Sequence, residues 1–321
     1  MIDYFPIVEP FVTGMLDVGD GQQLYFDVRG NPNGKPAVVL HGGPGQGSHP
    51  AMTRGFDPQL YKIILFDQRG CGRSLPHASA PDTNMDANTT WHLIRDMETL
   101  RNHLHVDRWL ICGASWGSAL ALAYAIKFPD RVTELVLMAI FTAQAKEYQW
   151  LYHDLGAALP KDFNAFRSLG SKTDSSRSIF YNYSQLLGSD DRSIQLATAR
   201  AWCDWEDAVL SNEPNARRSY PTPDTSDDMI AFARICAHYA LHDAWLADDG
   251  VMHSKNPFVD IHAVIIHGRQ DRGCPAEIAE RLCDGWTKAS LFILEDSGHL
   301  ASPSKKLKLL QALREFALTG Q

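Results

Sequence analysis

The sequence contains few cysteines, and they stand far apart. None of the six forms a C-x-x-C pair within the 321 residues. We therefore expect neither a zinc ribbon nor a disulfide framework, but reduced thiols in a reducing compartment. The chain also lacks a basic cluster, and 30 Lys and Arg against 38 Asp and Glu give a net charge of −8. A surface for nucleic acid or for an anionic membrane is therefore not expected.

Long apolar runs are absent as well. No run approaches the roughly 18 residues that a membrane span needs. The first residues, MIDYFPIVEPFVTG, lack the basic and apolar regions of a signal peptide. We therefore expect a cytoplasmic protein. Apolar residues still make up 45% of the chain and charged residues 21%, which is typical of a globular protein with a sizeable core.

Short apolar runs alternate with helical patterns in the first part of the chain. Continuous runs, typical of central strands covered on both faces, occupy residues 37–40, 63–66, 109–112 and 134–139. Residues 23–29 alternate like a half-buried strand, and helical spacing occupies 90–105 and 118–128. Such strand–helix alternation predicts an α/β protein with a mostly parallel sheet and helices on both faces.

The pattern changes between residues 142 and 256. No convincing strand occurs there, only helical segments and two stretches that we expect to be exposed loops, 171–178 and 211–228. Strand patterns resume at 263–267 and 291–294, and a helix closes the chain at 305–319. We therefore expect a core formed by residues 1–141 and 257–321, with an all-helical cap inserted as residues 142–256.

The strongest local motif is G-x-S-x-G at residues 113–117. It directly follows the predicted strand 109–112 and directly precedes a helix. A sharp strand-to-helix turn leaves no room for side chains at the glycine positions and presents the serine hydroxyl at the carboxyl edge of the sheet. The motif therefore predicts that Ser115 is a nucleophile.

A serine nucleophile needs a base that takes its proton. In α/β proteins whose serine nucleophile stands on such a strand-to-helix turn, the acid comes after the serine in the chain and the histidine comes after the acid. Asp271 comes just after the strand 263–267, and His299 just after the strand 291–294, so both are expected at the edge that carries Ser115. We expect His299 to shuttle the proton and Asp271 to orient its imidazole. Asp296 is the alternative acid, and His267 is expected to be a core histidine.

Glycines follow another predicted strand, in His41-Gly-Gly-Pro-Gly. An oxyanion hole needs backbone N–H groups that no side chain obstructs. We therefore expect the amides of Gly43 and Trp116 to form one. A phosphate loop is disfavoured because no Lys-Ser/Thr pair follows the glycines. The charged, glycine-containing segment 67–74 is expected to brace the site from below.

No metal site is predicted. His238 and His242 have the spacing of H-E-x-x-H, but no glutamate follows His238. The sequence shows no nucleotide-binding pattern either, so neither a metal nor a cofactor is expected.

The motifs together closely resemble those of the proline iminopeptidases (prolyl aminopeptidases) of the α/β-hydrolase fold. HGGPG, FDQRGCGRS, NTTW, GASWGSALALAYA and DSGH stand in the order and spacing of that family, over nearly the whole chain. The resemblance implies an α/β-hydrolase with a helical cap. It also implies a serine exopeptidase without a cofactor that removes an N-terminal proline from small peptides.

The resemblance also implies residues of the substrate pocket. The segment WCDWEDA resembles a cap helix whose glutamate binds the α-amine of the substrate, and Glu206 stands at that position. A buried carboxylate suits a charged amine that leaves water. Phe141 and Cys274 match further pocket positions, whereas the aromatic residue of the family is absent near Leu151.

The chain departs from the family in a second cap segment, I-E-x-H-Y-F. Here that segment reads ICAHYA, so Cys236 replaces a glutamate and Ala240 replaces an aromatic residue. One of the two carboxylates of the amine site is therefore missing. Two functions follow: a prolyl aminopeptidase of altered selectivity, or an esterase or amidase for small uncharged acyl compounds.

Overall fold

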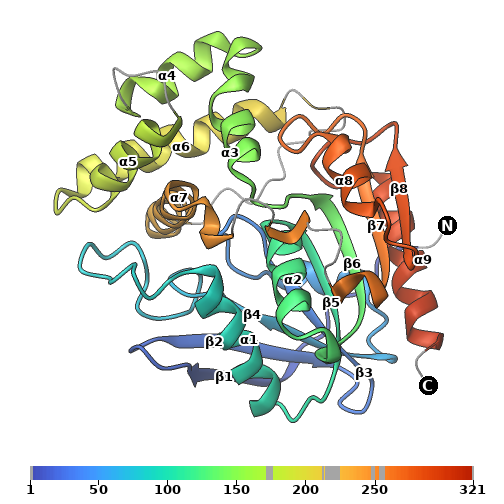
Figure 1. Ribbon diagram of the computed structural model, residues 1–321. Helices are drawn as coiled ribbons and strands as arrows, with labels where there is room; N and C mark the ends of the chain where they lie inside the picture. The colour runs from blue at the N-terminus through green and yellow to red at the C-terminus, as the bar shows by residue number, and fades with distance from the viewer. Residues whose placement is uncertain are drawn as a thin grey trace.

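The strands of the protein form one sheet that is antiparallel at one end and parallel elsewhere. The computed structural model describes residues 3–170, 176–211, 213, 225–246, 250–252 and 257–319. The strands are β1 (Pro10–Asp17), β2 (Gln23–Gly30), β3 (Lys35–Leu40), β4 (Tyr61–Phe66), β5 (Trp109–Ser115), β6 (Val132–Ile140), β7 (His262–Gly268) and β8 (Ala289–Leu294). Their order in the sheet is β1-β2-β4-β3-β5-β6-β7-β8 (Figure 1). β2 pairs antiparallel with β1 and β4, and all other pairs are parallel. The predicted mostly parallel sheet is confirmed.

Both faces of the central strands are buried, which explains their continuous apolar sequences. In β5, Ile111 packs into the apolar cluster on one face of the sheet, and Leu110 and Cys112 pack into the cluster on the other face. The helices of the core are α1 (Thr90–His103), α2 (Trp116–Lys127), α8 (Ala276–Cys283) and α9 (Pro303–Thr319). Side chains of α1, α2 and α8 belong to the first cluster, and those of α9 to the second, so helices cover both faces.

The described residues between β6 and β7 form helices only. These are α3 (Ala145–Tyr152), α4 (Pro160–Gly170), α5 (Ser176–Leu187), α6 (Arg192–Ser211) and α7 (Ser226–Leu241). Figure 1 shows α3 to α6 together beyond one edge of the sheet, with α7 between them and the core. We propose that they form the cap expected for residues 142–256. Short 3₁₀ helices complete the fold: Pro50–Gly55, Pro129–Arg131, Asp154–Ala157, Asp243–Trp245, Gly250–Met252 and Pro257–Asp260.

The structure corrects several expectations. It adds β1 and α8, which no pattern indicated. Residues 171–175, 212 and 214–224 of the two expected loops lie outside the described residues. The exposed-loop expectation is wrong for Glu213, which is buried, and for 226–228, which open α7. Residues 176–178 likewise belong to α5.

One arginine of α7 is bonded to the core. Arg234 is buried, and its guanidinium donates hydrogen bonds to four backbone carbonyls of the segment between β4 and α1. The acceptors are the carbonyl oxygens of Ala78, Ala80, Pro81 and Thr83. These hydrogen bonds hold α7 against the segment 78–83, although the two lie far apart in the sequence.

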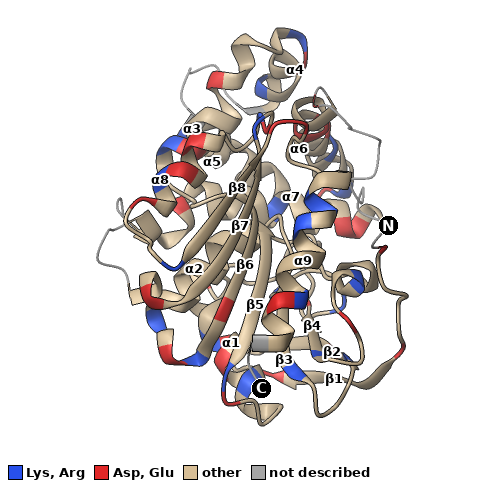
Figure 2. Ribbon diagram, turned by 90° about the vertical axis from the view of Figure 1, so that its right-hand side faces the viewer, with Lys and Arg blue, Asp and Glu red and all other residues tan. Residues whose placement is uncertain are grey.

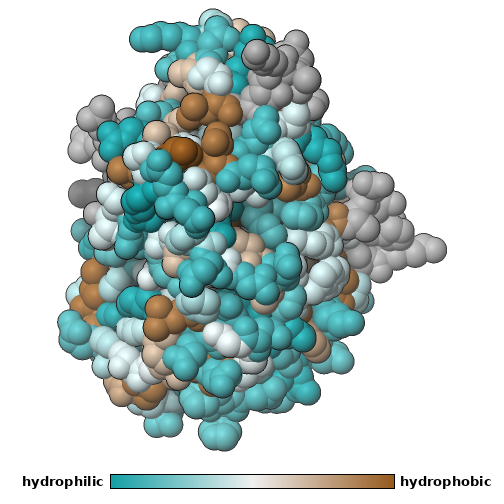
Figure 3. Space-filling view, turned by 90° about the vertical axis from the view of Figure 1, so that its left-hand side faces the viewer, coloured by the Kyte–Doolittle hydropathy of each residue, from teal (hydrophilic) through white to brown (hydrophobic). Residues whose placement is uncertain are grey.

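The surface carries charges of both signs. On the side drawn in Figure 2, from which α9 is seen, Lys and Arg are interspersed with Asp and Glu. The face drawn in Figure 3 is mostly hydrophilic, and its apolar residues lie in small separate groups. Among the described residues, no helix has both the length and the apolar character needed to cross a membrane.

Candidate active site

Ser115 lies on a sharp turn between β5 and α2. Its φ of +56° is a strained backbone conformation of the kind that nucleophilic serines adopt at such turns. A Cβ atom at Gly113 would lie 2.3 Å from the carbonyl oxygen of Gly117, and one at Gly117 would lie 2.5 Å from that of Leu40. Both contacts are impossible, so the turn requires glycine on either side of Ala114-Ser115-Trp116.

Asp271 and His299 follow β7 and β8, and their side chains bond to each other. Oδ2 of Asp271 lies 2.8 Å from Nδ1 of His299, while Oδ1 accepts a hydrogen bond of 2.8 Å from the backbone N–H of Cys274. Burial by itself would raise the pKa of Asp271, but the charge and hydrogen bond of His299 outweigh it and hold that pKa below its usual value. Burial would likewise lower the pKa of His299, and Asp271 raises it instead.

Ser115 and His299 line the same cavity. The contacts of the described residues include no hydrogen bond between Ser115 Oγ and His299. Catalytic hydrogen bonds of this kind are often long without substrate and tighten when substrate binds. The structure thus brings the acid and the base into contact and places the serine at the same cavity.

Asp296, the alternative acid, and His267, the expected core histidine, have other hydrogen-bond partners, although Nε2 of His267 also lies 3.6 Å from Oδ2 of Asp271. Asp296 is exposed, and its carboxylate accepts hydrogen bonds from Ser304 Oγ at 2.6 Å and Ser297 Oγ at 3.0 Å. His267 is fully buried; its Nδ1 accepts from the N–H of Ile140 at 2.9 Å and its Nε2 donates to the carbonyl of Cys274 at 2.8 Å. Burial lowers the pKa of His267, so it acts as a neutral link between β6 and the loop of Asp271.

The glycine loop after β3 reaches the same cavity through Gly43 and Pro44. Gly43 has a φ of +111°, and a Cβ there would lie 2.7 Å from the nitrogen of Gly45, so only glycine fits. Trp116 is the first residue of α2, where backbone N–H groups have no partner within the helix. Gly43 and Trp116 therefore remain our candidates for an oxyanion hole.

Gln68 connects the glycine loop to the nucleophile turn. Its backbone N–H donates to Nε2 of His41 at 3.0 Å, its side-chain amide donates to the carbonyl of His41 at 3.1 Å, and its Oε1 accepts from the Trp116 indole at 2.9 Å. Burial lowers the pKa of His41, so that its imidazole is a neutral acceptor. One side chain of the 67–74 segment thus holds both candidate parts of the oxyanion hole.

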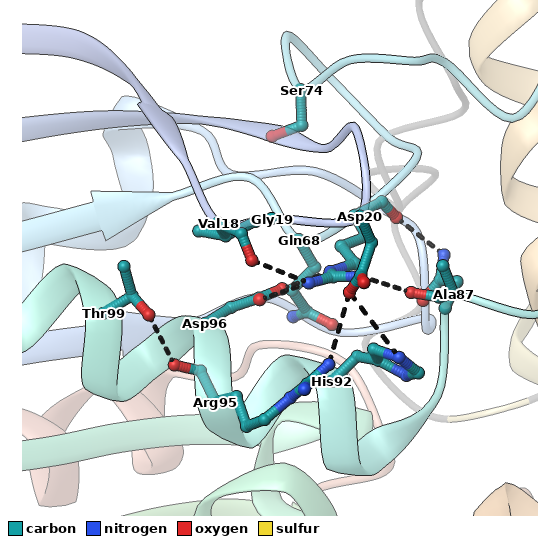
Figure 4. A network of polar contacts seen from close by, with 12 residues as sticks. Val18, Gly19, Asp20, Gln68, Ser74, Ala87, His92, Arg95, Asp96 and Thr99 are labelled. Carbon is teal, nitrogen blue, oxygen red and sulfur yellow. Dashed lines mark hydrogen bonds and ion pairs between the residues drawn. The ribbon is translucent and has the colours of Figure 1, made fainter.

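Arg69 anchors the same segment in the core. Its guanidinium donates to both carboxylate oxygens of Asp96, at 2.6 and 2.7 Å, and to Asp20 and the carbonyl of Ala87. Figure 4 labels these three acceptor residues. Burial raises the pKa of Asp96 to about 6, although the bonds from Arg69 lower it. This buried ion pair and its backbone bonds support the expectation that residues 67–74 brace the site.

The wall of the cavity at Ser115 is largely apolar. Phe141, Tyr148, Leu151, Tyr152 and Val209 supply aromatic and aliphatic surface. The phenyl ring of Phe141 packs edge-on against Tyr148, with centroids 5.3 Å apart. Sequence reasoning noted the missing aromatic residue near Leu151 but overlooked Tyr148 and Tyr152, which lie on the same helix, α3. The two tyrosines stand four residues apart, a spacing that places both on one face of a helix, and this spacing was the signal that could have found them.

Glu206 projects from α6 into this cavity. Its Oε1 accepts hydrogen bonds from the Tyr152 hydroxyl at 2.7 Å and from the Trp202 indole at 2.8 Å. Burial raises the pKa of Glu206 to about 7, and the two hydrogen bonds oppose that shift. Among the described residues both donors reach Oε1, so Oε2 is open to a ligand.

Cys236 and Cys274 also line the cavity. The thiol of Cys236 donates to the carbonyl of Pro44 at 3.2 Å, and burial raises the pKa of both thiols well above their usual value. Ala240 does not line this cavity. It lines a neighbouring one, which Tyr148 also lines.

One set of side chains has the spacing of metal ligands. Ligand atoms of Asp271, Cys274 and His299 all lie within 4.8 Å of one another. Asp271 and His299 are bonded to each other, and the raised pKa of Cys274 disfavours the thiolate that a metal would require. The cluster is therefore explained by the acid–base pair and the wall of the pocket.

Comparison with known proteins extends these observations. The family described as alpha/beta hydrolase fold matches residues 35–305. The chain is 41% identical to a probable proline iminopeptidase of Streptomyces coelicolor, over 98% of each chain. It is 42% identical to a proline iminopeptidase of Arabidopsis thaliana, over 93% of this chain and 77% of that one.

Solved structures share the fold at low sequence identity. The proline iminopeptidase of Mycobacterium smegmatis is 18% identical with a TM-score of 0.58, covering 97% of this chain and 100% of that one. VinJ is 19% identical with a TM-score of 0.64, covering 96% of this chain and 99% of that one.

Proposed function

The chain belongs to the proline iminopeptidase family of α/β hydrolases, and we propose that it releases an N-terminal proline, or a similar small residue, from short peptides. Ser115 Oγ attacks the carbonyl carbon of the first residue while His299 accepts the serine proton. The N–H groups of Gly43 and Trp116 stabilise the oxyanion that forms. Asp271 fixes the tautomer of His299 and stabilises its charged form.

The second half of the reaction uses the same groups. Protonated His299 gives its proton to the departing amine, and the peptide bond breaks to leave an acyl-enzyme on Ser115. Water then attacks this ester, with His299 again as the base, and releases the free amino acid. All of these steps use side chains and backbone of the chain itself, so we propose that neither metal nor cofactor takes part.

The position of Glu206 is the observation that carries this proposal. Among the described residues that line the cavity of Ser115, Glu206 is the only one that carries a carboxylate, and the wall of the cavity is largely apolar. A protonated amine that enters this cavity needs an anionic acceptor, because an unpaired buried charge is costly. Oε2 of Glu206 meets that need. A carboxylate that recognises a free amine beside the nucleophile favours an exopeptidase.

A second cleft is available for the part of the substrate that follows the scissile bond. This larger cleft meets the first cavity at Ser115, Glu206 and His299, and its lining also includes the loop that contains Gln46 and Arg73. We propose that the acyl residue occupies the smaller cavity, beside Phe141 and Tyr148, and that the leaving peptide extends through the larger cleft. The free thiols of all six cysteines support a reducing compartment such as the cytoplasm.

An esterase or amidase for uncharged acyl compounds is the second candidate. Cys236, with a neutral thiol, occupies a position of the cavity wall where a second carboxylate would strengthen amine binding. A pocket with one carboxylate of raised pKa also admits neutral substrates.

Substitution of Glu206 separates the two functions. We expect Glu206→Gln to raise KM for prolyl anilide by about ten- to a hundredfold, because a charge-assisted hydrogen bond is lost, and to leave KM for a short-chain ester unchanged. Asp204→Asn removes an exposed charge from the same helix and is the matched control. Equal losses on both substrates would contradict the aminopeptidase proposal.

A further inference from the structure

A second glutamate of the cap contacts both loops that carry the catalytic acid and base. Glu213 follows α6 and is buried. Its Oε1 accepts a hydrogen bond of 2.8 Å from the backbone N–H of Arg272, the residue next to Asp271. Its Oε2 accepts a hydrogen bond from the backbone N–H of His299 itself. One carboxylate therefore joins the two loops on the side of the cap.

The contact between Glu213 and the backbone of His299 explains why a glycine, Gly298, precedes His299. A Cβ atom at Gly298 would lie 2.2 Å from Oε2 of Glu213 and 2.8 Å from its Cβ. Any side chain at Gly298 would therefore push the carboxylate away from His299. The loop that carries the base therefore needs glycine at position 298 for Glu213 to approach the backbone of His299 this closely.

A buried lysine holds the same peptide unit from the other side. Lys305, near the start of α9, donates from Nζ to the carbonyl oxygen of His299 at 2.8 Å and also to that of Gly298. The backbone of His299 is thus held by an anion at its N–H group and by a cation at its carbonyl group. Hydrogen bonds to charged groups are stronger than neutral ones, so both contacts restrict the position of the base.

We propose that Glu213 is a positioning residue for the Asp271–His299 pair. It links the helix that carries Glu206 to the two catalytic loops. The position of the amine site relative to the acid–base pair is thereby fixed. This inference rests on the proposed triad, but it does not depend on the identity of the substrate. It assigns to Glu213 an action through His299 and no contact with substrate.

The charges around His299 give the proposal a specific signature. Asp271 and Glu213 favour the charged imidazole and raise the pKa of His299, whereas Lys305 lowers it. His267 and Glu206 also lie within electrostatic range of His299. Glu213 is faced by Asp271, His299, Lys305 and Cys274. Loss of the Glu213 charge must therefore lower the pKa of His299, and loss of the Lys305 charge must raise it.

The test uses Glu213→Gln and a neutral short-chain ester, which avoids any effect of amine binding. An amide cannot accept from both N–H groups, because its NH₂ would face one of them. We expect kcat per titrated active site to fall about tenfold or more with KM nearly unchanged. We also expect the acidic limb of the pH profile to move to lower pH. Lys305→Met should move that limb in the opposite direction.

Two controls distinguish positioning from a loss of stability. Glu98 of α1 bonds to Arg101 in the same helix and to Tyr124 of α2, so Glu98→Gln should lower Tm without moving the pH profile. Glu213→Asp keeps the charge but shortens the side chain, so it should lower kcat and leave the acidic limb in place, and it serves if Glu213→Gln does not fold. A Glu213→Gln enzyme with unchanged kcat per active site and an unchanged limb would overturn the proposal. Ester hydrolysis above a few per cent of the wild-type rate in Ser115→Ala would instead overturn the triad.

Discussion

The carboxylate of Asp271 lies 2.8 Å from Nδ1 of His299, although the two residues come from separate loops. Asp296 stands only three positions before His299 and bonds to Ser304 and Ser297 instead. The parallel pairing of β7 and β8, with Gly268 opposite Leu294, explains the difference. Both strands end at the same edge, and the loops that follow them meet there.

This contact predicts unequal effects of two similar substitutions. Asp271→Asn should lower kcat by about 10³–10⁴-fold, because the amide favours the wrong tautomer of His299. Asp296→Asn removes an exposed charge and should change kcat by no more than about twofold. Steady-state kinetics on one ester substrate would compare them, and the reverse order would make Asp296 the acid.

Ser115→Ala should abolish hydrolysis and leave the fold intact. Alanine is smaller than serine and bears the same backbone strain at φ of +56°, so Tm should remain close to that of the wild type. Catalysis by the remaining groups should be roughly 10³–10⁴-fold above the reaction in water and far below the wild type. An activity above a few per cent would mean that another residue is the nucleophile.

The raised pKa of Glu206 predicts a pH dependence for amine substrates. Only the ionised carboxylate attracts an ammonium group, so KM for prolyl anilide should fall as pH rises through about 7. The gain should end where the α-amine of the substrate loses its own proton, at about pH 8. KM for a neutral ester should not follow this curve, and neither substrate should follow it in Glu206→Gln. Identical KM profiles for both substrates in the wild type would contradict this role.

Cys236→Glu should improve the peptidase and weaken the fold. A second carboxylate near Glu206 adds a charge-assisted hydrogen bond for the substrate amine, and kcat/KM for prolyl anilide should rise by about tenfold. Without substrate the two carboxylates repel each other in an apolar cavity, so Tm should fall. Cys236→Gln has the same size without the charge and should not improve the anilide reaction.

Tyr148 and Tyr152 offer a matched pair of substitutions. The Tyr148 hydroxyl is buried and has no hydrogen-bond partner among the described residues, whereas the Tyr152 hydroxyl bonds to Glu206. Tyr148→Phe should leave the free energy of unfolding unchanged or raise it by about 1 kcal/mol, and Tyr152→Phe should lower it by about as much or more. Denaturant unfolding would measure both, and a clear loss of stability in Tyr148→Phe would reveal a bonded hydroxyl.

The parts of the fold that are buried on both faces could be predicted from the sequence. The continuous apolar runs of β3, β4, β5 and β6 arise because clusters cover both sides of the sheet. β1 gave no such signal, because most of its residues are exposed and, within the described sheet, it pairs with β2 alone. α8 is only eight residues long, too short for a clear helical period in isolation.

For the candidate site, the sequence indicated the positions of residues that stand at or just after the end of a strand. Ser115 is the last residue of β5, and Asp271 and His299 lie in the loops that follow β7 and β8, so the strand positions alone bring them to one edge. Glu213 lies in a polar stretch rich in Pro, Asn and Arg, which is typical of exposed loops. Its burial results from contact with loops that are distant in the sequence, and no local pattern encodes such a contact.

The bonds of Arg234 have a consequence for engineering the cap. A shuffled enzyme that takes residues 142–256 from a relative would place a foreign α7 against the native 78–83 segment. Any mismatch there would leave a buried guanidinium, or the four carbonyls that it satisfies, without partners, and such buried groups are costly. The exchangeable cassette is therefore discontinuous in sequence, since residues 78–83 must travel together with the helices that they hold.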